Sequence, residues 1–343
     1  MRVGVLTGGG DCPGLNPAIR AVTRRCISDY DDHVLGIKNG WDGLISGDVE
    51  PLSLYSVTGI LPKGGTILGT SRHNPLIKEE NVQRIMQNVR RYELDAVVTI
   101  GGEDTLNAAE KLAERGLKYI AIPKTIDNDI GGTDMTFGFD TAVAVATDAI
   151  DRLHTTAEAH HRVIVVEVMG RQSGWIAVMS GIAGGADCIL IPEVPFTVDE
   201  TCEMLTKRHK HGKNFSIVVL AEGAYPKEMG KPYSKTGKVD EYGHLMYGGI
   251  GEVIARQIQE QTGMETRVVV LGLLQRGGSP TPYDRVLATR FGTFAADMVH
   301  EQKFGYMAGL RGTQIVSCKV SEALKTRRSV DPKLYEVAKV FFE

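Results

Sequence analysis

Two glycine-rich turns in this sequence each follow an apolar run and lead into a helix-like segment. The first turn, TGGGDCPGLNPA, covers residues 7–18, and the second, GGEDT, covers residues 101–105. Glycine lets the backbone come close to a ligand, and the amide groups at the start of a helix favour an anion. Both turns therefore indicate phosphate as a ligand. Glu103 and Asp104, however, lie directly behind the second pair of glycines, where negative charge would repel a phosphate.

A magnesium ion explains one of these two acids. Mg²⁺ binds one or two carboxylates together with phosphate oxygens and water, so we predict Glu103 as its ligand. From the residues alone Asp104 stays unexplained, apart from the favourable effect of an acid in the first turn of a helix. The first turn matches neither GxGxxG nor GxxxxGK[ST], and a tight turn without a ligand is the alternative reading of it.

A second pair of acids, Asp127 and Asp129, lies in PKTIDNDIGGTD after another apolar run. Residues two apart in an extended chain point the same way. Two carboxylates at a strand end suit a general base with a metal or an electrostatic partner, although an inert, solvated turn is the alternative. Lys124, in the same stretch, adds a point charge that can hold phosphate.

Arginines follow or precede several apolar runs, and the guanidinium group is the preferred partner of phosphate oxygens. They are Arg72 in TSRHNP, Arg162 and Arg171 on either side of VIVVEVMG, and Arg276 in LLQRGG. A single arginine is usually a solvated surface residue, whereas several around one sheet indicate an anion site. Glu222, at the end of FSIVVLAEG, either bonds sugar hydroxyls or caps a strand.

The elements that must position these residues alternate along the chain. We predict strands at 2–7, 94–100, 119–124, 162–169, 188–193, 215–223, 267–272 and 314–318, and helices at 16–28, 105–115, 140–155, 198–210, 249–262 and 282–300. The alternation predicts an α/β fold with mostly parallel sheets flanked by helices. Ligands bind beyond the carboxyl ends of such strands, where the glycine turns and charged residues lie. Residues 225–249, rich in Gly, Lys and Tyr, are expected as an exposed excursion.

The composition excludes several classes of protein. The chain has 343 residues, of which 42% are hydrophobic, and a net charge of −3, as expected for a globular protein of about two domains without a nucleic-acid partner. No apolar run approaches the ~18 residues of a membrane helix, and the start, MRVGVLTGGG, lacks signal-peptide architecture. Five scattered cysteines without a CxxC indicate neither zinc nor disulfides. We therefore expect a cytoplasmic protein.

The motifs TGGGDCPGLNPAIR, LGTSR, GGEDT, PKTIDND, VVEVMGRQSGW, AEG and LQRGGSPTPYDR resemble, in order and spacing, the 6-phosphofructokinase family over residues 1 to about 320. The resemblance implies Mg²⁺-dependent phosphorylation of the 1-hydroxyl of fructose 6-phosphate by two similar lobes with the site between them. The donor-binding lobe would comprise 1–138 plus about 275–310, and the fructose 6-phosphate lobe about 139–274 plus about 311–325. Residues 326–343 would form a C-terminal helix.

The resemblance also implies roles for individual residues. Asp127 would take the proton from the sugar hydroxyl, Asp129 and Arg171 would support the transferring phosphoryl group with Thr125 close by, and Glu103 would bind Mg²⁺. The donor-binding residues would be Gly10, Arg72, Asp104 and Lys124, and the fructose 6-phosphate positions are Thr125, Asp127, Arg162, Met169, Gly170, Arg171, Glu222, Arg267, Leu273 and Arg276. Leu273 replaces a usual histidine, which removes one contact to the sugar 6-phosphate. In the family, the equivalents of Arg162 and Arg267 come from a neighbouring subunit, which implies a homo-oligomer with shared active sites.

Asp104 and Lys124 also bear on the identity of the phosphoryl donor. ATP-using bacterial members read GGDG and PGTIDND, with glycine at both positions, and the Asp–Lys pair resembles the pyrophosphate-dependent branch. Asp104 would add negative charge where ATP places its α-phosphate, and two like charges a few ångströms apart repel by several kcal/mol. Lys124 would pair with Asp104 or with pyrophosphate. We therefore expect reversible phosphoryl transfer from pyrophosphate to fructose 6-phosphate.

Three other functions remain open from the sequence. The chain could be an ATP-dependent 6-phosphofructokinase that tolerates Asp104. NAD and lipid kinases share a GGDGT-type loop, but they lack the fructose 6-phosphate set around Arg162 and Arg276. A non-catalytic sugar-phosphate sensor would be expected to lose Asp127 or Glu103, and this chain has both.

Overall fold

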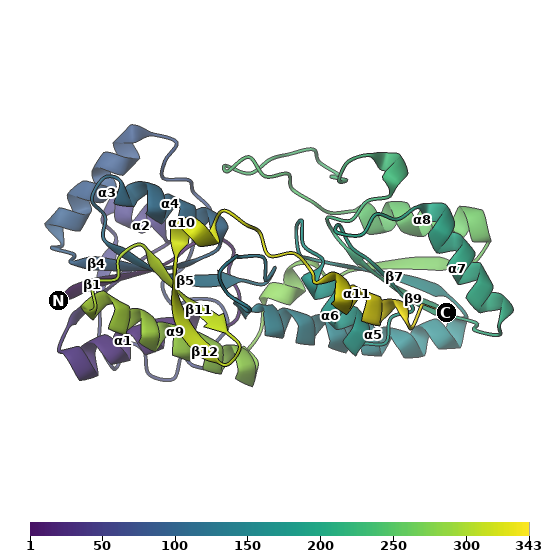
Figure 1. Ribbon diagram of the computed structural model, residues 1–343, viewed down its shortest axis with the longest axis horizontal. Helices are drawn as coiled ribbons and strands as arrows, with labels where there is room; N and C mark the ends of the chain where they lie inside the picture. The colour runs from purple at the N-terminus through teal and green to yellow at the C-terminus, as the bar shows by residue number, and fades with distance from the viewer. Residues whose placement is uncertain (343) are drawn as a thin grey trace. The chain divides into compact units, whose positions relative to one another are not determined.

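The computed structural model describes residues 1–342. These residues form two compact units, each with its own sheet (Figure 1). The first unit comprises Met1–Ile126, Ile130–Thr141 and Arg276–Arg328. The second comprises Asp127–Asp129, Ala142–Gln275 and the described residues from Ser329 onward. The chain thus crosses from one unit to the other several times.

The first unit is built on a mostly parallel sheet. Its strands are β1 (Arg2–Thr7), β2 (His33–Ile37), β3 (Val49–Leu52), β4 (Ala96–Gly101), β5 (Tyr119–Thr125), β6 (Phe137–Gly138), β11 (Tyr306–Arg311) and β12 (Gln314–Lys319). They lie in the order β12-β11-β5-β4-β1-β2-β3, with β6 paired to β5. Only the two edge strands, β3 and β12, pair antiparallel to their neighbours within the described chain. The predicted parallel core is confirmed.

Helices cover both faces of this sheet (Figure 1). They are α1 (Leu15–Tyr30) and α9 (Pro282–His300) on one face, and α2 (Trp41–Ser46), α3 (Glu79–Arg91), α4 (Glu103–Ala113) and the short α10 (Val320–Ala323) on the other. Leu6, Val97 and Leu106 are fully buried in the core between the sheet and α4. On the opposite face α1 and α9 pack closely, because a β-carbon built on Gly292 would lie only 2.6 Å from Ala21 Cβ.

The second unit has a parallel sheet in the order β10-β7-β9-β8. Its strands are β7 (Val163–Val168), β8 (Cys188–Leu190), β9 (Ser216–Ala221) and β10 (Thr266–Val270). Its helices are α5 (Phe139–His160, whose first turn belongs to the first unit), α6 (Trp175–Ala183), α7 (Val198–Lys210), α8 (Ile250–Thr262), α11 (Pro332–Lys339) and the 3₁₀ segments η1 (Lys227–Met229) and η2 (Gly272–Arg276). The loops after β7 and β9 leave the sheet at its carboxyl edge.

Two expectations about the end of the chain differ from the structure. Residues 311–325 were expected in the second unit, but β12 forms a hairpin with β11 and therefore belongs to the first sheet. The helix expected over 326–343 is shorter, because α11 begins only after Asp331, whose side chain accepts a hydrogen bond from the Lys333 N–H at 2.9 Å. The last part of that expected helix, residue 343, lies outside the described residues.

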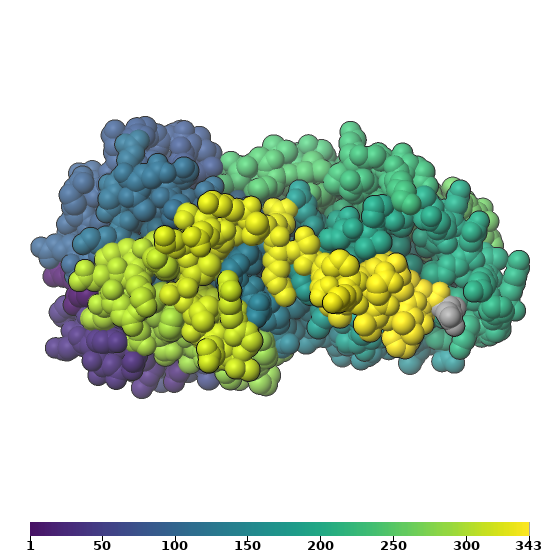
Figure 2. Space-filling view, in the orientation of Figure 1, coloured from purple at the N-terminus to yellow at the C-terminus, as the bar shows by residue number. Residues whose placement is uncertain are grey.

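The C-terminal helix α11 lies on the surface of the second unit, where Figure 2 shows it in yellow. It packs against α6, and the Tyr335 hydroxyl donates to the Ile189 carbonyl oxygen at 2.8 Å. This hydrogen bond fixes the helix to the middle of the short strand β8. In residues 1–342, no helix combines the length and the apolar character needed to cross a membrane.

A buried carboxylate joins the starts of α5 and α9. Asp284 is fully buried, and its Oδ2 accepts hydrogen bonds from the Thr141 N–H at 2.8 Å and the Thr141 hydroxyl at 2.6 Å. Burial raises the pKa of Asp284 to about 6. The Asp284 side chain is therefore needed as a hydrogen-bond acceptor, although burial leaves its charged form poorly solvated.

We predict that Asp284→Ala lowers the free energy of unfolding by about 2–4 kcal/mol, because two buried donors then lose their acceptor. Asp284→Asn keeps an acceptor oxygen without the charge and should lose less than half as much. Urea unfolding followed by circular dichroism measures both losses. Equal losses in the two variants would contradict the acceptor role.

Candidate active site

The loop after β1 is held beside the segment that carries Arg72. The Gly9 N–H donates to the Ser71 carbonyl oxygen at 2.9 Å, and the Thr70 hydroxyl donates to the Gly9 carbonyl oxygen at 2.7 Å. Gly9 has a φ of 79°, a left-handed conformation that glycine adopts without strain. These bonds place Arg72 next to the glycine loop, although the two segments are some sixty residues apart in the sequence.

Three cationic side chains gather at this loop. The Lys124 ammonium donates to the Gly10 carbonyl oxygen, and Arg276 Nη1 donates to the Asp11 carbonyl oxygen at 3.1 Å. A β-carbon on Gly10 would lie 2.6 Å from Arg276 Nη1 and 3.2 Å from Arg72 Nη2, so only glycine leaves room for them. Lys124 is 3% exposed and Arg276 8% exposed. Several cationic groups beside bare glycine backbone are suited to bind an anion such as phosphate.

The two acids of the second glycine turn lie at the start of α4. Glu103 and Asp104 are its first two residues. The Glu103 side chain is half exposed, and its Oε2 lies 3.1 Å from Arg327 Nη2. A β-carbon on Gly8 would lie 2.6 Å from Thr105 Oγ1, so the first turn of α4 packs directly on the glycine loop. Both acids therefore belong to the same edge of the sheet as Lys124.

Strand β5 ends at Thr125, and the predicted acid pair lies in the turn that follows it. Asp127 is 5% exposed, Asp129 is half-buried, and Asn128 between them has a left-handed φ of 53°. The Ser173 hydroxyl donates to the Asp127 carbonyl oxygen at 3.2 Å and ties this turn to the loop after β7. Sequence reasoning missed Ser173, because a serine before a helix is a common cap.

The loop after β7 is fixed by carboxylates that accept from its backbone. Glu222 Oε1 accepts from the Arg171 N–H at 3.0 Å, and both Glu193 oxygens accept from the Gly174 N–H at 3.0 Å. Gly170 and Arg171 have φ values of 141° and 52°. For arginine this left-handed conformation is strained, so the Glu222 carboxylate stabilises a backbone that would otherwise relax.

The structure thus brings together four of the predicted sugar-phosphate residues, Met169, Gly170, Arg171 and Glu222. Burial raises the pKa of Glu222 to about 7, hydrogen bonds from the Arg171 and Gly170 backbone oppose that rise, and the charge of Asp127 adds to it. The sequence offered capping a strand or bonding a sugar as roles for Glu222. Holding the adjacent loop is a further role that the structure adds.

Arg162 and Arg267 lie elsewhere in the second unit. Both bind the Glu265 carboxylate, with Nη2 distances to Oε1 of 2.9 and 2.7 Å. Arg162 immediately precedes β7, whereas Met169 and Arg171 follow it. A six-residue strand separates its two ends by about 20 Å. The structure therefore does not place these two arginines with Arg171 in the same chain.

The segment η2 carries two predicted residues with different surroundings. Leu273 is 74% exposed, whereas Arg276 is buried at the glycine loop. The sequence grouped Arg276 with the sugar-phosphate residues, but its guanidinium lies beside Gly10 with Arg72. Its position is next to the residues predicted to bind the donor.

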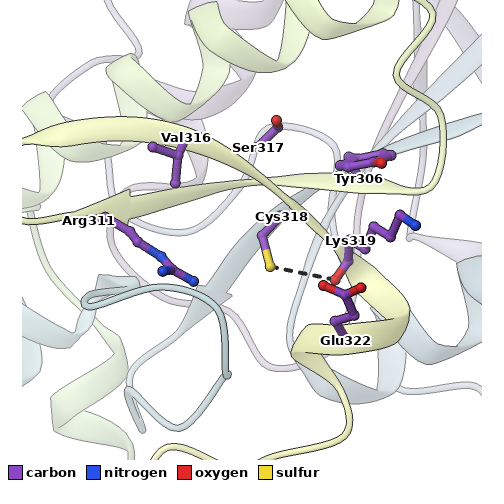
Figure 3. A pocket seen from close by; sticks show the side chains of 7 residues that line it. All are labelled: Tyr306, Arg311, Val316, Ser317, Cys318, Lys319 and Glu322. Carbon is purple, nitrogen blue, oxygen red and sulfur yellow. Dashed lines mark hydrogen bonds between the residues drawn. The ribbon is translucent and has the colours of Figure 1, made fainter.

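A cavity of about 440 Å³ opens on the β11–β12 hairpin (Figure 3). Its lining residues are Tyr306, Arg311, Val316, Ser317, Cys318, Lys319 and Glu322. None of them was predicted as a site residue, and burial raises the pKa of the Cys318 thiol. The groups with phosphate chemistry instead lie at the glycine loop and the loop after β7.

Comparisons with known proteins agree with the fold and the motifs. A family model described as phosphofructokinase matches residues 2–299. A pyrophosphate–fructose 6-phosphate 1-phosphotransferase from Streptomyces coelicolor is 54% identical over 100% of both chains. An ATP-dependent 6-phosphofructokinase 3 from the same organism is 51% identical over 98% of this chain and 99% of that one. The crystal structure of Pichia pastoris phosphofructokinase in the T-state superposes with a TM-score of 0.84 at 31% identity. The match covers 99% of this chain and 36% of the longer Pichia chain.

We predict that Glu222→Gln changes how stability depends on pH. The pKa of Glu222 in the folded chain, about 7, lies above its ordinary value of 4.5. Between these values the folded chain binds more protons than the unfolded one, so this carboxyl lowers stability as pH rises. Glutamine stays neutral and keeps an acceptor oxygen. The stability of the variant relative to the unsubstituted chain should therefore rise from pH 5 to 7, as measured by urea unfolding. A difference that is constant over this range would contradict the prediction.

Proposed function

Because the chain belongs to the phosphofructokinase family, we propose that it transfers a phosphoryl group from pyrophosphate to the 1-hydroxyl of fructose 6-phosphate. The products are fructose 1,6-bisphosphate and phosphate, and the reaction is reversible and Mg²⁺-dependent. It serves glycolysis and gluconeogenesis in the cytoplasm. The observation that carries the choice of donor is the buried Lys124 ammonium bound to the Gly10 carbonyl oxygen.

Overall similarity favours pyrophosphate by a narrow margin, since the Streptomyces coelicolor relatives named for pyrophosphate and for ATP are 54% and 51% identical to this chain. Local residues add to this preference. The Lys124 side chain fills a part of the glycine loop that a glycine at this position would leave open. Asp104 adds a negative charge in the first turn of α4. A further phosphate of a nucleotide beside Asp104 would be repelled by several kcal/mol. Pyrophosphate has no such further phosphate.

The first unit binds the donor in this proposal. Lys124 and Arg72 contact pyrophosphate oxygens above the bare backbone of Gly10, and Arg276 contacts the phosphoryl group that is transferred. The half-exposed carboxylate of Glu103 fits Mg²⁺, whose other ligands would be phosphate oxygens and water. When bound, Mg²⁺ neutralises donor charge.

The second unit binds the acceptor and supplies the base. Asp127, in a turn fixed by Ser173, takes the proton from the 1-hydroxyl as the oxygen attacks phosphorus. Phosphoryl transfer needs positioning and charge stabilisation more than covalent chemistry. Arg171 and Asp129, with Thr125 at the end of β5, provide the positioning and stabilise the phosphoryl group. The sugar itself is contacted by Met169, Gly170, Glu222 and Leu273.

A second copy of the chain completes the site in this proposal. Arg162 and Arg267 share Glu265 at the amino end of β7, a strand's length from the loop that holds Arg171. They therefore suit the sugar 6-phosphate of a neighbouring protomer rather than that of their own. This makes the protein a homo-oligomer with active sites shared between subunits.

The test is formation of fructose 1,6-bisphosphate from fructose 6-phosphate and Mg²⁺, with pyrophosphate and ATP compared in parallel. We expect kcat/KM with pyrophosphate to exceed that with ATP at least about 100-fold, as a repulsion of ~3 kcal/mol implies. Turnover with ATP alone would refute the choice of donor. Binding of fructose 6-phosphate without turnover of either donor would instead indicate a sugar-phosphate sensor.

We predict that the double substitution Asp104→Gly with Lys124→Gly raises kcat/KM for ATP at least about tenfold and lowers it for pyrophosphate. It removes the repelling charge and opens the glycine loop. The matched control is Lys111→Gln with Glu114→Gln, which removes an exposed ion pair from the same helix region and should leave both donors unchanged. If the double variant loses pyrophosphate activity without gaining ATP activity, the two residues do not select the donor.

A further inference from the structure

The excursion between η1 and α8 ends in a small loop, residues 234–248, which we call the flap. In Figure 1 it is part of the green loop that leads into α8. Ser234 and Gly248 bridge its base, and Val239 and Leu245 bridge it near the tip. The Asp240 N–H donates to the His244 carbonyl oxygen at 2.9 Å, which closes the tip.

The tip presents a carboxylate in a fixed orientation. Asp240 Oδ1 accepts from the backbone N–H groups of Tyr242 and His244, each at 3.0 Å. Its other oxygen, Oδ2, lies 3.7 Å from Arg171 Nη2. The two side chains are 18% and 34% exposed. The flap therefore holds a negative charge against the guanidinium that the proposed function assigns to the transferring phosphoryl group.

The two partners differ in how firmly they are held. The backbone of Arg171 is fixed by Glu222 and by the left-handed conformation of its loop. None of the flap residues 234–248 is buried, its Val239 is 60% exposed, and its ion pair between Lys235 Nζ and Glu252 Oε2, at 3.1 Å, is exposed. A segment with few buried contacts opens at low free energy. When the pair separates, the flap is thus the part that moves.

We propose that Asp240 sets the affinity of Arg171 for the anionic group of the substrates. This inference rests on the proposed function, in which Arg171 binds phosphoryl oxygens. Without substrate, Asp240 neutralises the guanidinium; when a phosphate group binds, its oxygens replace the carboxylate and the flap tip moves away. An ion pair at 3.7 Å on a partly exposed surface is weak, whereas phosphate offers several oxygens to the guanidinium fork. Neutral sugars cannot displace the carboxylate, so the contact favours phosphate esters.

Calorimetric titration with fructose 1,6-bisphosphate in the absence of inorganic phosphate, which prevents turnover, tests this competition. Asp240→Asn keeps an oxygen that accepts from Tyr242 and His244 but removes the charge that competes for Arg171. We expect its Kd for fructose 1,6-bisphosphate, whose 1-phosphate is the group that Arg171 contacts in the proposed function, to be about fivefold lower than that of the unsubstituted chain, as loss of a weak ion pair implies. Glu228→Gln makes the same charge change at an exposed position of the excursion and should leave Kd unchanged within about twofold. An unchanged or higher Kd in Asp240→Asn overturns the proposal.

Trypsin cleavage at Lys235 and Lys238, both exposed in the flap, reports its release. Fructose 1,6-bisphosphate should speed cleavage of the unsubstituted chain, and Asp240→Asn should be cleaved as fast without ligand. Slower cleavage on addition of fructose 1,6-bisphosphate would show that the flap closes over the ligand, which contradicts displacement. Neither measurement needs turnover. A chain that binds fructose 1,6-bisphosphate and passes both tests, yet uses no donor, would refute the proposed function alone. An active enzyme that fails both tests would refute only the role of Asp240.

Discussion

The site depends first on the burial of positive charge against bare backbone. Lys124 is almost fully buried, and its ammonium is bound to the carbonyl oxygen of Gly10. Arg276 and Arg72 lie at the same loop, and this concentration of positive charge beside bare backbone favours an anion. The same demand explains the glycines, since a side chain at position 10 would occupy the space of the Arg276 and Arg72 guanidinium groups. The glycine at position 10 and the placement of the two guanidinium groups therefore depend on each other.

Buried and half-buried carboxylates are the counterpart of these cations, and three of them hold backbone in place. Glu222 and Glu193 accept from the loop after β7, and Glu167, inside β7, accepts from the Gly249 and Gly251 N–H groups at the start of α8. Burial raises the pKa values of Glu222 and Glu167, which shows how poorly their charges are solvated. This unfavourable burial of charge is tolerated because loops that carry ligand-binding groups must be held in uncommon conformations.

Most of the parallel framework could be predicted from the sequence, because buried parallel strands read as continuous apolar runs. The β11–β12 hairpin could not be assigned correctly: β11 begins within FGYMAGLR, a short run with two glycines that was not recognised as a strand. The strands β2, HVLGI, and β3, VEPL, were missed because they are short and are interrupted by a glycine and a proline.

In the site, local motifs identified Lys124, Arg72 and the residues around Arg171. Contacts that join distant segments had no signal in the sequence. Asp240 lies about seventy residues from Arg171 in a polar excursion without periodicity, and Ser173 resembled an ordinary helix cap. The motif identified Arg276. The sequence could not show that its guanidinium would lie beside Gly10 and Asp11, because this position depends on how η2 turns.

The opposite charges at positions 104 and 124 also constrain how such a chain can evolve. On the proposed assignment, replacing Lys124 alone leaves Asp104 facing the donor with one cation fewer, and replacing Asp104 alone leaves the loop still filled by Lys124. Neither single step creates a good site for a nucleotide. A lineage that changes its phosphoryl donor must therefore pass through a poorer enzyme, or acquire both substitutions in close succession, so the two positions should covary across relatives that use different donors.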